Sequence, residues 1–245
     1  MAENPQLSRN ISVFGDRTLN EAEEFRWQSE KVDLIRHTVK NLSARRALAD
    51  VGCFTGMATA QYGSLGFARV VGFDASLEAL KLAAGRGIDT RRWLIGETSC
   101  PAEDNEFDVI VAADIIEHLI DTDGFLHELG RILCSGGFLI ITTPNLAAWR
   151  SRLRMLLGKP PISYPGASST VQADEMIDLN HIRIANSGEW QALFRAHGFT
   201  VIDIKGWSLM HAIEGGFGVR VRKTIDRYLT RKPTLAFGLM FLLRR

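Results

Sequence analysis

The stretch from Leu48 to Gly56, LADVGCFTG, decides how the rest of the chain is interpreted. It begins inside an apolar run, Ala47–Val51, that predicts a short buried strand, and the residues from Met57 onward have the composition of a helix. Gly52 and Gly56 predict a tight turn between them, because glycine has no Cβ and lets backbone N–H groups approach a ligand closely. The N-terminus of the helix directs further N–H groups to the same place. The sequence therefore predicts a strand, a glycine turn and a helix around a nucleoside-type ligand.

A second strand, Arg69–Phe73, ends in Asp74, twenty-two residues after Gly52. An acidic residue at the end of the second strand of an open α/β sheet accepts hydrogen bonds from ribose hydroxyls when the two strands are adjacent and parallel. NAD would also use such an acid, but its fingerprint is G-x-G-x-x-G, and Phe54 stands two residues after Gly52. The glycine spacing therefore argues against an NAD-dependent reductase.

With these motifs the sequence resembles the class I S-adenosylmethionine (SAM) dependent methyltransferases. It is most similar to their small-molecule branch (methyltransferase type 11/12-like), which includes quinone, sugar and natural-product enzymes. DVGCFTG resembles the first motif of that family, VVGFDAS its acidic second-strand end, and FDVIVAADIIEHL its fourth-strand motif. The resemblance is strong over residues 45–145 and has one departure, Phe54, where the family usually has glycine. It implies an α/β fold with a doubly wound, seven-stranded, mostly parallel sheet whose antiparallel last strand lies between the fifth and sixth.

The resemblance also implies the cofactor, SAM, and the residues that bind it. They belong to the glycine turn, the second-strand end, the loop after the third strand and the end of the fourth strand. These candidates are Asp50, Gly52, Cys53, Phe54, Gly56, Asp74, Ala75, Glu97, Thr98, Ala113 and Asp114. Glu97, just beyond a third strand expected over residues 91–95, is the candidate for reading adenine. Arg26, in an expected N-terminal lid helix, is a candidate for the methionine carboxylate, the alternative being a solvated charge.

The candidate catalytic residues follow the fourth strand. The run Asp108–Ile116 is apolar on both faces in its first half, which suits a central parallel strand covered by helices. Asp114, Glu117 and His118 lie at and beyond its carboxyl end, where doubly wound sheets bind ligands. Similar methyltransferases often carry a histidine where His181 stands. Because a hydroxyl acceptor must lose its proton, we expect His118 or His181 to be a base or a substrate contact, the alternative for each being a structural histidine.

The 245 residues predict a single methyltransferase domain. Residues 1–42 are expected to form an arm and a lid helix, with the helix beginning near Asn20. Residues 146–186 and 207–232 are expected to be insertions that cap the acceptor. The first insertion carries a basic cluster that suits a phosphate, a nucleotide-linked sugar or an anionic membrane surface, or else forms a solvated helix face. This basic cluster is Arg150, Arg152, Arg154 and Lys159.

The composition excludes several classes of partner. A net charge of +1 and 23% charged residues show no overall attraction to nucleic acid. The three cysteines have no C-x-x-C spacing, and no spacing of His, Asp and Glu resembles a ligand set, so no metal is expected. The polar first 20 residues and the lack of a long apolar run predict a cytoplasmic protein without a transmembrane segment. Peripheral membrane contact and the oligomeric state stay open.

Two functions are consistent with these features. The first is transfer of a methyl group from SAM to a small-molecule acceptor, at a hydroxyl oxygen of a sugar, lipid-linked or quinone-like molecule, which the basic cluster allows to be anionic. The second is a SAM-binding accessory protein without strong catalysis, which the unusual Phe54 suggests.

Overall fold

A computed structural model describes residues 21–165, 181–208 and 217–245. Its seven strands form one sheet in the order β3-β2-β1-β4-β5-β7-β6. The first five strands pair in parallel, and β7 runs antiparallel between β5 and β6, as the family resemblance implied. The strands are β1 Ala47–Val51, β2 Arg69–Asp74, β3 Asp89–Arg92, β4 Phe107–Ala113, β5 Leu133–Pro144, β6 Thr200–Trp207 and β7 Gly238–Arg244.

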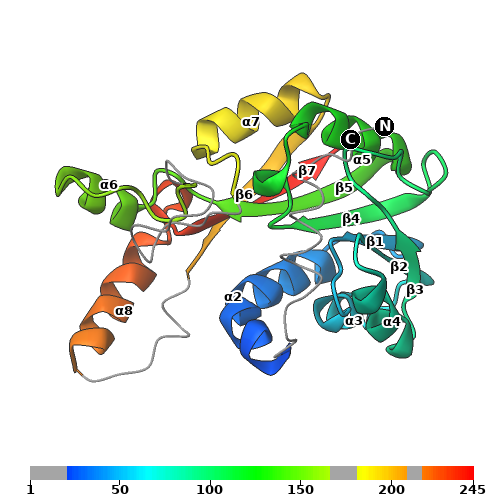
Figure 1. Ribbon diagram of the computed structural model, residues 1–245, viewed down its shortest axis with the longest axis horizontal. Coiled ribbons are helices and arrows are strands. Elements are labelled where there is room, and N and C mark those ends of the chain that lie inside the picture. The colour runs from blue at the N-terminus through cyan, green and yellow to red at the C-terminus, as the bar shows by residue number, and fades with distance from the viewer. Residues whose placement is uncertain (1–20, 166–180, 209–216) are drawn as a thin grey trace.

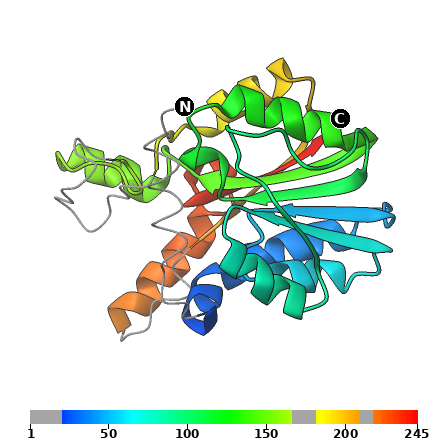
Figure 2. The ribbon, with the colours of Figure 1, turned by 45° about the vertical axis from the view of Figure 1, so that its right-hand side comes forward.

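Helices cover both faces of this sheet. In Figures 1 and 2, α2, α3 and α4 lie on one face, and α5 and α7 lie on the other. Two short helices, η1 and η3, precede α5 and β7. The helices are α2 Glu21–Lys40, α3 Met57–Gly63, α4 Leu77–Gly85, η1 Ile116–His118, α5 Thr122–Ile132, α6 Trp149–Leu156, α7 Ser187–Ala196, α8 Phe217–Leu229 and η3 Pro233–Leu235.

The central strand β4 is apolar from Val109 to its end. Val109 and Val111 pack in the core cluster beneath α2 and α3, whereas Ile110 and Ala112 pack in the cluster beneath α5 and α7. Successive side chains of a strand point to opposite faces, so the part of a strand that lies between two helical layers is apolar on both faces. The prediction of a central strand here is confirmed.

Helices α6 and α8, which belong to the two segments expected to be insertions, project from the sheet in Figure 1. Asp226 of α8 is only 2% exposed and connects them. It accepts hydrogen bonds from the Trp149 indole N–H at 2.8 Å and from the Ser208 hydroxyl. One buried carboxylate therefore joins the start of α6, the end of β6 and α8. The expected N-terminal arm, Asn20, residues 166–180 and residues 209–216 lie outside the described residues.

Some boundaries differ from the sequence expectations. The third strand is Asp89–Arg92 rather than residues 91–95. The Trp93 N–H still donates to the carbonyl of Asp74, but the chain then turns away and the Trp93 side chain stacks in the core on Phe125. Helix α5 ends at Ile132, and the glycines at 136 and 137 lie in an irregular start of β5. Helix α7 is capped by Asn186, whose side chain accepts from two N–H groups in a capping box.

Candidate cofactor and acceptor site

The glycine turn forms as the sequence predicts. Gly52 and Gly56 have φ of 77° and 80°, in the left-handed region that favours glycine. The N–H groups of Gly52 and Cys53 both donate to the carbonyl of Phe73, at 2.8 and 3.0 Å, so the turn is bonded to the end of β2. Phe54 also has a positive φ, 48°, which explains why a glycine is usual there. The phenylalanine bears some backbone strain but does not prevent the turn.

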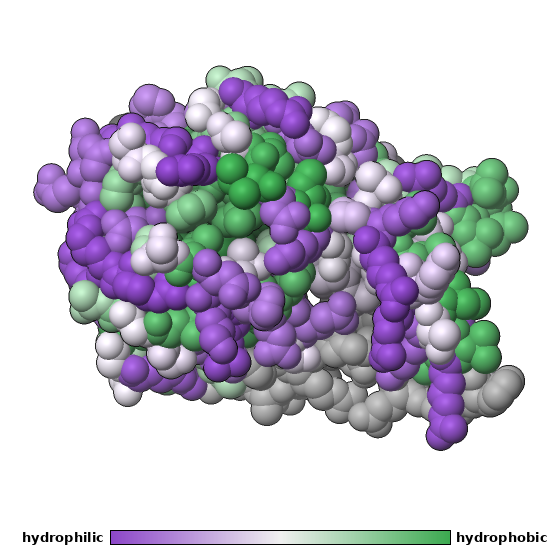
Figure 3. All heavy atoms as spheres, turned by 180° about the vertical axis from the view of Figure 1, so that it is seen from behind, coloured by the Kyte–Doolittle hydropathy of each residue, from purple (hydrophilic) through white to green (hydrophobic). Residues whose placement is uncertain are grey.

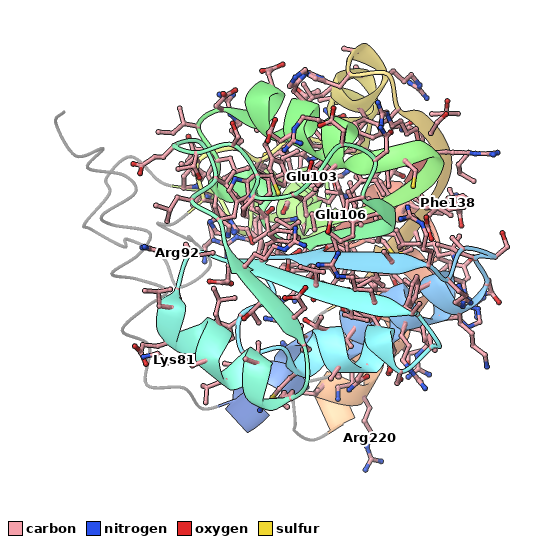
Figure 4. The ribbon with its side chains drawn as sticks, turned by 90° about the vertical axis from the view of Figure 1, so that its right-hand side faces the viewer. Lys81, Arg92, Glu103, Glu106, Phe138 and Arg220 are labelled. Carbon is pink, nitrogen blue, oxygen red and sulfur yellow. The ribbon has the colours of Figure 1, made fainter. Side chains whose placement is uncertain are left out.

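Asp74 holds the two loops at this edge together. One carboxylate oxygen accepts from the Phe54 N–H and the other from the Ser76 N–H, each at 2.9 Å. Burial raises the pKa of Asp74, and the hydrogen bonds from these amides offset part of that rise. The next residue, Ala75, accepts a hydrogen bond through its carbonyl from the Arg92 guanidinium at 3.1 Å. Arg92 is marked in Figure 4. Asp74 therefore adjoins the glycine turn directly, as a shared ligand site requires.

Asp50 lies beneath the turn at the end of β1. It is only 4% exposed and accepts a hydrogen bond from the Thr59 hydroxyl of α3 at 2.5 Å. Burial raises the pKa of Asp50 to about 7, and the negative charge of Asp74 adds to the rise. The hydrogen bond from the Thr59 hydroxyl offsets part of this rise.

Glu97 and Thr98 lie in a turn beyond β3. Both N–H groups donate to the carbonyl of Leu94 at 3.1 Å, and the carbonyl of Thr98 accepts from the Trp93 indole at 3.0 Å. The Trp93 N–H donates in turn to the carbonyl of Asp74 at 3.0 Å. The turn is thus fixed next to the end of β2, with the side chains of Glu97 and Thr98 exposed.

An ion pair that the sequence did not predict lies at the end of β4. Ala113 ends the strand, and the next residue, Asp114, has a φ of 53°. The Asp114 carboxylate accepts hydrogen bonds from the Thr142 hydroxyl, at 2.6 Å, and from the Lys31 ammonium of α2. Lys31 is only 3% exposed and also lies over the ring of Trp207, 5.4 Å from its centroid. Burial favours a raised pKa for Asp114, but the Lys31 ammonium outweighs it and the pKa is lowered.

The spacing of residues along α2 indicates that Lys31 is buried. It stands four residues before Ile35 and seven before Thr38, and both are buried, so Lys31 lies on the buried face of α2. The expected lid helix therefore does contribute a cation to the site, but this cation meets Asp114. Arg26, the residue proposed from the sequence, lies in the part of α2 whose side chains are not described.

The two catalytic candidates are in contact. The rings of His118 and His181 have centroids 4.9 Å apart. The segment after His181 is fixed to η1, because the N–H groups of Ile182 and Arg183 donate to the carbonyl of Glu117 at 2.8 and 3.0 Å. Two histidines that are distant in the sequence therefore share one position beyond the end of β4.

Glu117 lies between these histidines and the core. Its side chain is fully buried, and neither carboxylate oxygen has a hydrogen-bond partner among the described residues. Burial raises its pKa well above the usual range, and the nearby charge of Asp114 raises it further. Ligand atoms of Glu117, His118 and His181 lie within 4.8 Å of one another. The expectation of no metal came from spacing along the chain, which does not reveal a cluster assembled from two segments.

The basic cluster has a partly structural role. Arg152 donates to the carbonyl of Ala147 at 2.7 Å, and Arg154 donates to the carbonyl of Pro160 at 2.8 Å. These bonds shape the loop on each side of α6. Around them α6 and α8 expose large apolar side chains next to basic ones, and Figure 3 shows both kinds together over this projecting part. The exposed apolar residues are Leu153, Met155, Leu156, Leu157, Val221, Ile225 and Tyr228.

Comparison with known proteins assigns the sheet and its carboxyl edge to a family. A family model described as "Methyltransferase domain" matches residues 49–141, from β1 to β5. A ubiquinone biosynthesis O-methyltransferase of Bradyrhizobium sp. (strain ORS 278) is 36% identical over 123 residues, which are 48% of this chain and 46% of that protein. Residues 49–141 are therefore a methyltransferase domain. The cofactor that SAM-dependent methyltransferases such as the matched relatives use is SAM.

Other similarities cover more of this chain. A "Probable S-adenosylmethionine-dependent methyltransferase" of Mycolicibacterium smegmatis is 25% identical over 202 residues, 82% of this chain and 70% of that protein. The match to the Bradyrhizobium enzyme spans about half the length of that relative. A structure of the Haloferax volcanii Trm112 activator with a methyltransferase aligns with a TM-score of 0.66 at 15% identity, covering 94% of this chain and 96% of the other. This likeness shows the fold.

None of the helices in the described part of this chain is long and apolar enough to cross a membrane.

Proposed function

We propose that this methyltransferase transfers the methyl group of SAM to a hydroxyl oxygen of a small-molecule acceptor. The observation that carries the proposal is the contact between His118 and His181, whose rings meet 4.9 Å apart just beyond the strand end that carries Asp114. This position lies at the carboxyl edge of the parallel strands, where folds of this type bind ligands. The name of the Bradyrhizobium relative, an O-methyltransferase, supports an oxygen acceptor.

In this proposal SAM occupies the edge formed by β1, β2 and β4. The glycine turn lies against the cofactor, and Asp74 accepts from the ribose hydroxyls. Each Asp74 oxygen already accepts one N–H, and a carboxylate oxygen can accept two hydrogen bonds, so capacity for ribose remains. Glu97 and Thr98 border adenine, and Asp50, Ala113 and Asp114 line the remainder of the cofactor site.

The chemistry is an in-line displacement at an activated carbon. The acceptor oxygen forms a bond to the methyl carbon while the bond from that carbon to the sulfonium breaks, which leaves S-adenosylhomocysteine. The protein must hold the oxygen about 3–3.5 Å from the methyl group and exclude water. The hydroxyl proton leaves at this edge, where the paired imidazoles can accept it or orient the acceptor. The two insertions cover the acceptor.

The surface of the insertions favours an acceptor with an apolar part and an anionic part. Exposed Leu, Met, Val, Ile and Tyr side chains of α6 and α8 stand among arginines and lysines. Arg220 of α8 points away from the body of the domain in Figure 4. Basic helices with exposed apolar side chains also suit peripheral contact with an anionic membrane. A lipid-linked or quinone-like acceptor presented at such a surface fits both features.

The test uses the purified full chain, methyl-labelled SAM and small-molecule extracts from cells that lack the gene. We expect a molecule that gains one labelled methyl group and an equal amount of S-adenosylhomocysteine. His118→Gln and His181→Gln should lower the transfer rate while SAM affinity stays unchanged, with the surface substitution His197→Gln as the matched control. SAM binding without any methylated product would instead favour the accessory-protein function.

A further inference from the structure

The cluster of Glu117, His118 and His181 has the composition of a cation site. It brings one carboxylate and two imidazoles to within 4.8 Å from two separate segments of the chain. The backbone bonds from Ile182 and Arg183 to the Glu117 carbonyl fix the relative position of the two segments. The three donors are therefore held by the fold itself and do not depend on the conformation of a long surface side chain.

The burial of Glu117 is a second observation that indicates a ligand, separate from the short distances within the cluster. Its side chain is 0% exposed, and neither oxygen has a partner with good hydrogen-bond geometry among the described residues. The Thr143 hydroxyl is near enough to lower the pKa of Glu117 slightly, but it does not offset the effect of burial. A buried polar group without a well-aligned partner costs about 1–3 kcal/mol, and a charged one costs more. Buried carboxylates are normally paired with a cation or bound to a metal. Among the described residues, the nearby buried ammonium of Lys31 is already paired with Asp114.

The hydrogen bonding of His181 determines which ring nitrogen is available to bind a cation. Its Nδ1 lies 2.8 Å from the carbonyl oxygen of Ser163. A carbonyl can only accept, so Nδ1 must carry the proton, and the lone pair of a neutral ring is then on Nε2. Bonding of the second nitrogen to a backbone carbonyl is the arrangement that commonly orients a metal-binding histidine.

We propose that Glu117, His118 and His181 bind one divalent cation of intermediate hardness, such as Zn²⁺. Two imidazoles and one carboxylate form a donor set that occurs in catalytic zinc sites, where a fourth position stays open for water or substrate. The oxygen-rich sites that Ca²⁺ and Mg²⁺ prefer are different. Co²⁺ binds similar donors and serves as a coloured probe.

The role of the ion rests on the proposed methyl transfer. An acceptor hydroxyl at the open position would lose its proton to water more easily, because a bound cation lowers the pKa of the oxygen it binds. The resulting oxygen anion then forms the bond to the methyl carbon, and S-adenosylhomocysteine leaves. His118 and His181 would act as ligands rather than as the base, and the favoured acceptors would be phenols or vicinal diols, whose oxygens bind cations well.

The experiment measures metal binding directly on the untagged full chain after treatment with a chelator. Co²⁺ is titrated into the protein while its visible absorption is followed, and Zn²⁺ is then used to displace it. His181→Asn tests the site with little disturbance, because the asparagine amide can still donate to the Ser163 carbonyl but lacks an equivalent of Nε2. Glu117→Gln removes the charge at nearly constant size. His197→Asn is the control, since His197 lies by Asp123 at the end of α7 and does not belong to the cluster.

We expect one Co²⁺ per chain in the wild type and in His197→Asn, with affinity at least about tenfold lower in His181→Asn and Glu117→Gln. Zn²⁺ should raise the thermal midpoint of the wild type but not of His181→Asn. Absence of saturable Co²⁺ absorption in the folded wild type, or equal affinity in all variants, would overturn the proposal. SAM affinity of the chelator-treated protein is measured separately: loss of SAM binding with Co²⁺ binding intact counts against the proposed function only.

Discussion

Lys31→Met is the substitution whose effect on folding the structure defines most sharply. The Lys31 ammonium is 3% exposed and pairs with Asp114, whose side chain is 27% exposed and also bonded to Thr142. Methionine keeps most of the length and the apolar stem that packs near Trp207, so the change removes mainly the charge. The Asp114 carboxylate would then stay in a mostly buried position without its cation.

Removing one partner of a buried ion pair costs about 3–5 kcal/mol, because the other charge stays unpaired. Asp114 keeps some contact with solvent and the Thr142 hydroxyl, so we expect about 3 kcal/mol, the lower end of that range. Replacing both partners removes the unpaired charge. The double variant Lys31→Met, Asp114→Asn should therefore recover most of the loss.

Urea unfolding without SAM, followed by circular dichroism and by tryptophan fluorescence, measures these free energies. Lys205→Met is the control, since Lys205 is 35% exposed and lies 3.5 Å from Asp203 on the surface, where ion pairs contribute about 0–1 kcal/mol. A loss below about 1 kcal/mol for Lys31→Met, or a double variant no more stable than the single one, would refute the assigned role of the pair.

Three further predictions concern the turn, the buried acid and the insertion. Gly52→Ala would place a Cβ 2.3 Å from the Ile115 side chain, at a φ of +77°. The control is Gly66→Ala, where φ is +90° but no atom lies within 4 Å of the added Cβ. Urea unfolding should show a larger loss of stability for Gly52→Ala, and equal losses would contradict this. The pKa of Asp50 is raised from 3.8 to about 7. The free energy of unfolding of the SAM-free protein should therefore fall as the pH rises from about 4 to about 7, because the buried carboxyl group then loses its proton. The fall is at most about 4 kcal/mol. Asp50→Asn should remove this fall from the unfolding profile, and an unaltered profile would contradict the assignment. Arg150→Gln should raise the KM for an anionic acceptor without changing SAM affinity, whereas an unchanged KM would identify the basic cluster as solvated surface.

The sheet and the cofactor edge were predictable because their signals are local. Apolar runs followed by glycine or an acid define β1, β2 and β4, and parallel strands necessarily bring Gly52 and Asp74 to the same edge. Positive φ at Phe54 was not predictable from its residue type, since bulky residues rarely adopt it.

The acceptor side was less predictable because its contacts are long-range. Both histidines were identified as candidates, but only the fold reveals that His118 and His181 touch and that Glu117 is buried beside them. Lys31 has a visible periodicity on α2, yet its partner lies 83 residues away. Periodicity shows that a residue is buried, but it does not identify the residue it meets.

The central claim is that the glycine turn and Asp74 together bind SAM, and calorimetric titration of the folded full chain with SAM tests it most directly. We predict one saturable site in the wild type and in the surface control Asp203→Ala. Asp74→Ala should bind about ten- to a hundredfold more weakly, since it loses charge-assisted hydrogen bonds to ribose worth roughly 1.5–3 kcal/mol each and releases the Phe54 amide. Folded wild-type protein that does not bind SAM, or Asp74→Ala that binds it as tightly as the wild type, would contradict the account.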